Sequence, residues 1–264
     1  MLIADRPDLQ IFMLKRHAKT VFAGGMWVFP GGAVDPEDNQ INLDHTDVNE
    51  SEDPGSLLSE TNTNSLAFYI AAIRESFEES GILFSFRDNE QHLINFSDDL
   101  TRAHFDSLRQ KLNDQKTSFA DILRQERLTP AFSSLHPVAR WITPLGSPKR
   151  FDARFFIAAM PNNQIPIHDD GELVKSDWMR PNDILTACEQ EKMVLMSPTL
   201  RMVRNLAAFT STQAVLRAVS QDLSYQRVRV DTTHGNLLLP GEQGYDKANE
   251  DIETGWIRLR PGKN

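Results

Sequence analysis

The chain of 264 residues is 40% hydrophobic and 25% charged, which is typical of a soluble globular protein with one elaborated domain. It contains no run of about 18 apolar residues, which excludes a transmembrane helix, and its formal net charge of −9 argues against nonspecific nucleic-acid binding. The single cysteine, Cys188, excludes an internal disulfide and favours a reducing, cytoplasmic location.

The first predicted element is an apolar strand at residues 9–16, with the composition of a strand buried on both faces. It ends in a basic cluster that is either a solvated strand end or a contact for an anionic substrate, with Arg16 as the candidate substrate-binding residue. A second short strand is predicted at residues 26–29. The Pro30-Gly31-Gly32 turn after it allows the backbone to pass close to a neighbouring helix.

Residues 35–64 are rich in Asp, Asn, Ser, Glu and Thr and have few apolar positions. We therefore expect a surface excursion with a short helical piece, inserted at about residues 39–64. Most of its carboxylates are expected to be solvated, and Asp38 is kept as a candidate for the functional site.

A helix is predicted to begin near Ser65 and to end at Gly81, because glycine readily adopts the left-handed conformation that ends helices. One of its faces is apolar, with side chains at helical spacing that can pack against a core. These side chains belong to Leu66, Ile70, Ile73 and Phe77.

The opposite face of this helix is acidic. Glu75, Glu78 and Glu79 stand at positions i, i+3 and i+4, so their carboxylates emerge side by side. They repel one another unless a cation lies among them, and Mg²⁺ takes oxygen ligands of this kind. Arg74 lies within reach of Glu78 and can hold its carboxylate in place. For the acidic residues alone, a solvated helix face is the alternative.

Two stretches together resemble the signature of the Nudix hydrolases. One reads Arg-Glu-Ser-Phe-Glu-Glu-Ser-Gly-Ile at residues 74–82, and the other is the glycine turn at residues 27–32. The family pattern has an apolar residue in place of Ser76 and a shorter gap between the two stretches. Asp38 occupies the place of the first family glutamate.

The resemblance implies an α/β fold, a Nudix α/β/α sandwich with a mixed sheet. It also implies that Glu75, Glu78 and Glu79 bind Mg²⁺ or Mn²⁺, with a carbonyl of the glycine turn, assigned here to Gly31, as a further ligand. Glu75 is either a ligand or the base that activates water. Arg74 is expected to orient the carboxylates.

A helical insertion is predicted at about residues 97–129. It either covers the substrate cleft or packs on the flank of the fold. Strands are predicted at residues 137–144 and within 149–159. Arg150, Asp152 and Arg154 share one face of the second strand, either as a surface ion-pair row or as two guanidinium groups that bind a diphosphate.

These strands, with the glycine turn, give a narrower resemblance to the Nudix branch that includes the peroxisomal coenzyme A diphosphatases. It implies hydrolysis of the diphosphate in coenzyme A or acyl-coenzyme A. ADP-ribose, NADH or a nucleotide sugar are alternative substrates, removal of RNA caps is a weaker one, and an inactive ligand-binding module is an alternative of another class. The last residues, 260–264, do not form a peroxisomal address.

An acidic loop at residues 168–172 precedes a strand that carries Trp178. Nudix enzymes often place a glutamate there that faces the metal ions, and Glu172 fits this role, although a simple turn is the alternative. The division expected is a Nudix domain at residues 1–222 and an extension with a β-hairpin at 223–264, which covers a sheet edge or reaches a partner subunit. A homodimer is possible, and no membrane partner is expected.

Overall fold

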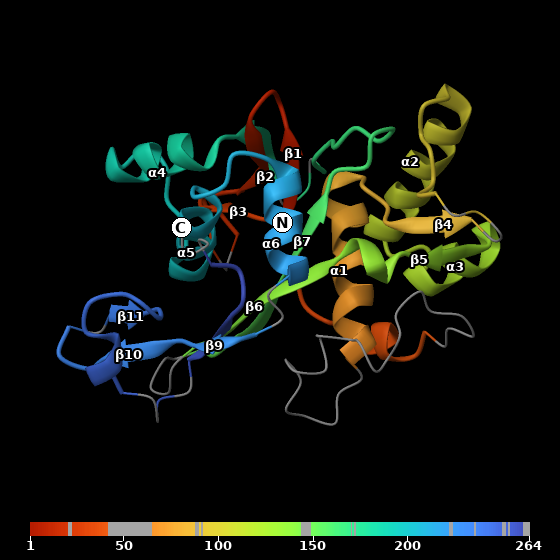
Figure 1. Ribbon diagram of the computed structural model, residues 1–264. Helices are drawn as coiled ribbons and strands as arrows, with labels where there is room; N and C mark the ends of the chain where they lie inside the picture. The colour runs from red at the N-terminus through yellow and green to blue at the C-terminus, as the bar shows by residue number, and fades with distance from the viewer. Residues whose placement is uncertain are drawn as a thin grey trace.

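The computed structural model describes residues 1–20, 23–41, 65–87, 90, 92–143, 149–169, 171, 173–221, 224–234, 236–249, 252 and 254–260. Most of the insertion predicted at residues 39–64 therefore lies outside the described residues. A mixed sheet forms the centre of the fold (Figure 1). Its order is β3 (Trp27–Val28), β2 (Leu9–Arg16), β1 (Leu2–Asp5), β7 (Asp152–Ala159), β6 (His136–Ile142), β12 (Gly255–Ile257) and β9 (Gln226–Arg227).

The strand predicted at residues 9–16 is β2, and its bounds are those expected. It pairs with β1 and β3, and also with β8 (Leu173–Met179). β1 and β7 run parallel, whereas the other pairs described in this sheet are antiparallel.

Helices cover both faces of the sheet, as the alternation along β2 illustrates. Phe12 and Leu14 point into one buried cluster, while Ile11 and Met13 point into another. The first cluster lies under α1 (Ser65–Ser80), α2 (Asp99–Asn113) and α3 (Phe119–Glu126), and the second under α4 (Pro181–Glu189), α5 (Ser197–Leu206) and α6 (Thr212–Gln221). This is the α/β/α sandwich that was expected.

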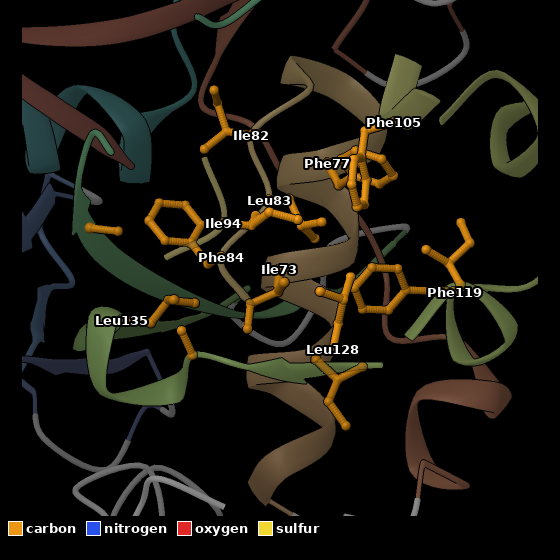
Figure 2. Close-up of a cluster of buried hydrophobic side chains, with 14 of the residues drawn as sticks. Ile73, Phe77, Ile82, Leu83, Phe84, Ile94, Phe105, Phe119, Leu128 and Leu135 are labelled. Atoms are coloured by element: carbon orange, nitrogen blue, oxygen red, sulfur yellow. The ribbon is translucent and has the colours of Figure 1, made fainter. Parts of the chain in front are cut away.

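Three residues of the apolar stripe of α1, Ile70, Ile73 and Phe77, are each 0% exposed, and Leu66 is partly buried against the same cluster. Figure 2 shows Phe77 in a cluster with Phe105 of α2 and Phe119 of α3. Between α1 and α2 the chain forms β4 (Ser85–Arg87), which pairs with β5 (Leu128–Pro130) directly after α3. The helices predicted at about residues 97–129 are thus present as α2 and α3, and they pack against the flank of α1. That this segment is an insertion stays a prediction.

The tail contributes strands to the central sheet as well as a hairpin. β10 (Arg229–Asp231) and β11 (Asn236–Leu238) form the predicted hairpin. β12 lies between β6 and β9 and pairs with both, so the tail covers the edge of β6. A Cβ atom at Gly255 would lie 2.0 Å from the Arg140 carbonyl oxygen, and only glycine allows this close approach. The division at residues 222/223 stays a prediction.

Short 3₁₀ turns complete the described fold at η1 (Pro36–Asn39), η3 (Phe132–Ser134) and η4 (Tyr245–Lys247). Within the described ranges, the helices are too short or too polar to cross a membrane.

Candidate active site

Arg74 is the centre of the acidic site. It lies in α1, is only 5% exposed, and uses all five of its N–H groups. Nε and Nη2 donate to the two oxygens of Asp38 in η1, each at 3.0 Å. Nη2 also donates to the Ala33 carbonyl at 2.8 Å. Arg74 therefore ties the glycine turn and η1 to the acidic helix.

The remaining Arg74 nitrogen, Nη1, binds two of the expected metal ligands. It donates to Glu75 Oε1 and to Glu78 Oε2, each at 3.0 Å. The orienting role that the Nudix resemblance implies for Arg74 is thus matched by its contacts.

The glycine turn lies directly against the carboxylates. The Gly31 backbone N–H donates to Glu79 Oε2 at 2.8 Å. A Cβ atom at Gly32 would lie 2.2 Å from Glu75 Oε1, so a side chain at this position would displace that carboxylate. The turn predicted to allow a close backbone approach therefore makes one. The observed contact uses the Gly31 amide, and metal binding through its carbonyl stays a prediction.

Burial changes the acidity of all three carboxyl groups. It raises the pKa of Glu75, and it raises the pKa of Glu78 to about 7 and that of Glu79 to about 8. Arg74 opposes the pKa shifts of Glu75 and Glu78, and the Gly31 amide opposes that of Glu79. Because the charged forms are disfavoured in this environment, added positive charge would stabilise them.

The C-terminal end of α1 is fixed by hydrogen bonds from two other segments, α2 and residues 167–169. Gly81 has φ of +72° and its N–H donates to the Phe77 carbonyl, so it ends the helix as predicted. Each of the next three carbonyls accepts a tertiary hydrogen bond where a free helix would leave it unpaired. The bonds are Arg109 Nε and Asn113 Nδ2 to Glu78 O, Asp169 N to Glu79 O, and Ile167 N to Ser80 O.

Arg16 lies close enough to Glu79 to lower the pKa of its carboxyl, and Asp169 lies close enough to raise it. The basic strand end is therefore near the acidic helix, as substrate contact requires. Glu172 lies outside the described residues, so its role stays a prediction.

The two other candidate arginines are held by protein groups. Arg150 Nε donates to the Thr143 carbonyl at 2.8 Å. The Arg154 side chain is 6% exposed, pairs with Asp152 at 2.8 Å and lies over the Phe68 ring. The pair of Arg154 with Asp152 matches the ion-pair alternative, whereas the described Arg150 contact is to a backbone carbonyl. Substrate binding by either arginine stays a prediction.

Several site residues were not found from the sequence. Arg109 and Asn113 belong to the helical insertion. The pattern there predicted a buried apolar face, but it did not predict which group either of these polar side chains would bind. Asp169 belongs to the acidic loop predicted at residues 168–172, but the sequence did not indicate its contact with Glu79. The pairing of Asp38 with Arg74 joins residues 36 positions apart, and only the family resemblance pointed to Asp38.

The donor chemistry fits a hard divalent cation, because three carboxylates with raised pKa values lie within about one helical turn. In the part of the chain that the structure describes, no three His, Cys, Asp or Glu side chains are grouped as a ready metal site. Hydrogen bonds from Arg74 and Gly31 engage one oxygen of each of the three carboxylates. Glu75, Glu78 and Glu79 are the residues that would hold a cation.

The α/β/α fold and the glutamate-bearing helix beside a glycine turn are those of the Nudix class. A Nudix hydrolase from Alicyclobacillus acidocaldarius has a similar fold, with a TM-score of 0.63 and 23% identity over 83% of this chain and 92% of that one. The sequence profile of the NUDT19 Nudix domain matches residues 3–206, and the chain therefore belongs to the NUDT19 Nudix domain family.

Two similar proteins are named acyl-coenzyme A diphosphatase NUDT19. The Xenopus laevis protein is 26% identical over 236 residues, which is 76% of this chain and 60% of that protein. The human protein is 24% identical over 285 residues, which is 93% of this chain and 74% of that protein. The chain thus spans less than two thirds of the Xenopus protein.

The raised pKa values predict a stability that depends on pH and metal together. The folded protein keeps protons on Glu78 and Glu79 above the ordinary carboxyl pKa of 4.5. The metal-free protein should therefore lose stability as the pH rises from about 5 to about 8.5. Stabilisation by Mg²⁺ should grow over the same window, because the cation binds carboxylates only after their protons leave.

This dependence can be measured as the Tm in EDTA and in Mg²⁺ across that pH range. Glu79→Gln, which cannot ionise, should flatten the slope in EDTA. Equal slopes for both proteins, or a Mg²⁺ effect of equal size at both ends of the range, would contradict the expected titration.

Proposed function

We propose that this Nudix hydrolase cleaves the diphosphate of coenzyme A or acyl-coenzyme A. The products would be adenosine 3′,5′-bisphosphate and a phosphopantetheine. The observation that carries the proposal is the placement of three carboxylates beside the glycine turn, with Glu75 and Glu78 held by Arg74 and Glu79 held by the Gly31 N–H. Membership of the NUDT19 Nudix domain family and the names of the two relatives support the substrate class.

We assign cation binding to Glu78 and Glu79, with Gly31 as a further ligand through its carbonyl. Glu75 serves as a third carboxylate ligand or as the base that removes a proton from water. A bound Mg²⁺ or Mn²⁺ would neutralise the negative charge of the diphosphate and lower the pKa of a coordinated water molecule. Arg74 keeps Glu75 and Glu78 oriented through Nη1.

Substrate binding is assigned to the arginines near the sheet. Arg16 lies close enough to lower the pKa of Glu79, and it would attract the diphosphate toward the acidic helix. Arg150 and Arg154 are proposed as further contacts, and Glu172 as an acidic group facing the site. A cytoplasmic location, a homodimer and the absence of a nucleic-acid partner belong to the same proposal.

A substrate panel tests the proposal on the full chain with Mg²⁺ and with Mn²⁺. We expect faster hydrolysis, by kcat/KM, of coenzyme A and acyl-coenzyme A than of ADP-ribose, NADH, nucleotide sugars or capped RNA. Adenosine 3′,5′-bisphosphate should be the nucleotide product. A preference for another diphosphate would retain the chemistry and refute the substrate. No turnover of any compound would favour a ligand-binding module.

A further inference from the structure

The helical insertion contacts the catalytic helix at the peptide group that joins two of the glutamates. Arg109 Nε of α2 donates to the Glu78 carbonyl at 2.9 Å, and Asn113 Nδ2 donates to the same oxygen at 3.3 Å. This carbonyl belongs to the peptide between Glu78 and Glu79. A rotation of that peptide would move the Cα–Cβ directions of both residues, and their carboxylates with them.

The Arg109 side chain is built into the fold. The residue is only 9% exposed, and its helix is anchored by Phe105 and Leu108 in the cluster that includes Phe77. A Cβ atom at Gly81 would lie 3.2 Å from Arg109 Nη1. The glycine that ends α1 thus also leaves room for the guanidinium group to cross the helix end.

The interaction is also favourable in its electrostatics. The final carbonyls of a helix lack intrahelical partners and carry partial negative charge. A guanidinium donor forms a charge-assisted hydrogen bond there, which is stronger than one between neutral groups. Without it, the last turn of α1, which carries both glutamates, would have fewer restraints.

We propose that Arg109 is a positioning residue of the catalytic site: it fixes the Glu78–Glu79 peptide, so that the helical insertion sets the placement of the cation-binding carboxylates. The proposal rests on the cation-binding part of the proposed function and is independent of which diphosphate is hydrolysed.

The test compares Mn²⁺ binding by the full chain and its variants, using calorimetry or electron paramagnetic resonance after removal of bound metal. Arg109→Gln should weaken Mn²⁺ binding by about tenfold, the lower end of the effects of outer-shell residues. It should lower kcat more than it raises KM for the nucleotide. Arg109→Lys keeps a cationic donor and should restore most of the affinity.

Arg102→Gln is the matched control in the same helix. Arg102 binds the Phe96 carbonyl and Asp99 and, in the described structure, has no recorded hydrogen bond to α1. We expect this variant to bind Mn²⁺ as the unmodified protein does. If Arg109→Gln, folded at the assay temperature, binds Mn²⁺ equally well, Arg109 only packs and the proposal is overturned.

The other outcomes also decide the proposal. If Arg109→Gln does not fold, Arg109→Met, which keeps an apolar side chain and lacks the donor, replaces it, and unchanged Mn²⁺ affinity in that variant would refute the positioning role. If the unmodified protein binds no Mn²⁺, the proposal fails together with the metal assignment. Weaker Mn²⁺ binding in the variant without hydrolysis of coenzyme A would support Arg109 and refute the substrate alone.

Discussion

Replacement of Glu79 by glutamine is expected to lower kcat by about a thousandfold or more, or about 4 kcal/mol of transition-state stabilisation. The amide has nearly the same shape and can still accept the hydrogen bond from the Gly31 N–H. It cannot supply the negative charge that a divalent cation needs. The loss of activity should therefore occur without loss of the fold.

The stability of this variant provides the sharper half of the test. Burial raises the pKa of Glu79 to about 8, so ionisation of this carboxyl destabilises the metal-free fold. In EDTA at about pH 8.5, Glu79→Gln should have a Tm equal to or above that of the unmodified protein. Turnover and the Tm are measured in parallel.

Glu189→Gln is a suitable control, because Glu189 is an exposed residue at the end of α4, on the other side of the sheet. It should leave both turnover and the Tm unchanged. If Glu79→Gln retained turnover within about tenfold of that of the unmodified protein, the assignment of Glu79 to the catalytic site would be wrong.

Replacement of Arg74 by alanine is expected to destabilise the fold by about 3–5 kcal/mol, the usual effect of removing one partner of a buried ion pair. Asp38, which is 1% exposed, would lose both of its Arg74 hydrogen bonds. Glu75 and Glu78 would lose their shared donor, so Mg²⁺-dependent turnover should fall as well. Denaturant unfolding gives the free-energy change.

A double-mutant cycle separates the ion pair from the other contacts of Arg74. Because Asp38→Asn removes the buried charge, the double variant Asp38→Asn/Arg74→Ala should lose less stability than the two single losses combined. Arg124→Ala is the control, since the pair of Arg124 with Asp121 is exposed and its removal should change the stability little. Strict additivity at Arg74 and Asp38 would contradict their coupling.

The elements that could be predicted are those with a strong local pattern. The apolar run of β2 gave its bounds, and helical spacing with Gly81 gave α1 and its end. The α1 pattern also gave the acidic face, and the resemblance linked it to the glycine turn across 42 positions between Gly32 and Arg74. Local periodicity alone contains no information on that contact.

Contacts that depend on how strands and helices meet could not be predicted. The alternation in β7 correctly placed Asp152 and Arg154 on one face, but the pairing of Asp152 with Arg140 depends on the register with β6. In the same way, the amphipathic pattern of α2 correctly gave Phe105, Leu108 and Leu112 as buried, but it also placed Leu100 on this face, which is 85% exposed, and it did not give the partner of Arg109. β1 was missed because it is four residues long and charged residues follow it.

The position of β12 has a consequence for how the protein is made. β6 acquires its neighbour on this side only from residues 255–257, and Gly255 follows Ile142 by 113 positions. During translation, β6 must therefore leave the ribosome well before the strand that covers it. Until then its backbone groups form an open sheet edge, which is prone to wrong pairing. Completion of the sheet is thus delayed until nearly the whole chain described here has been synthesised.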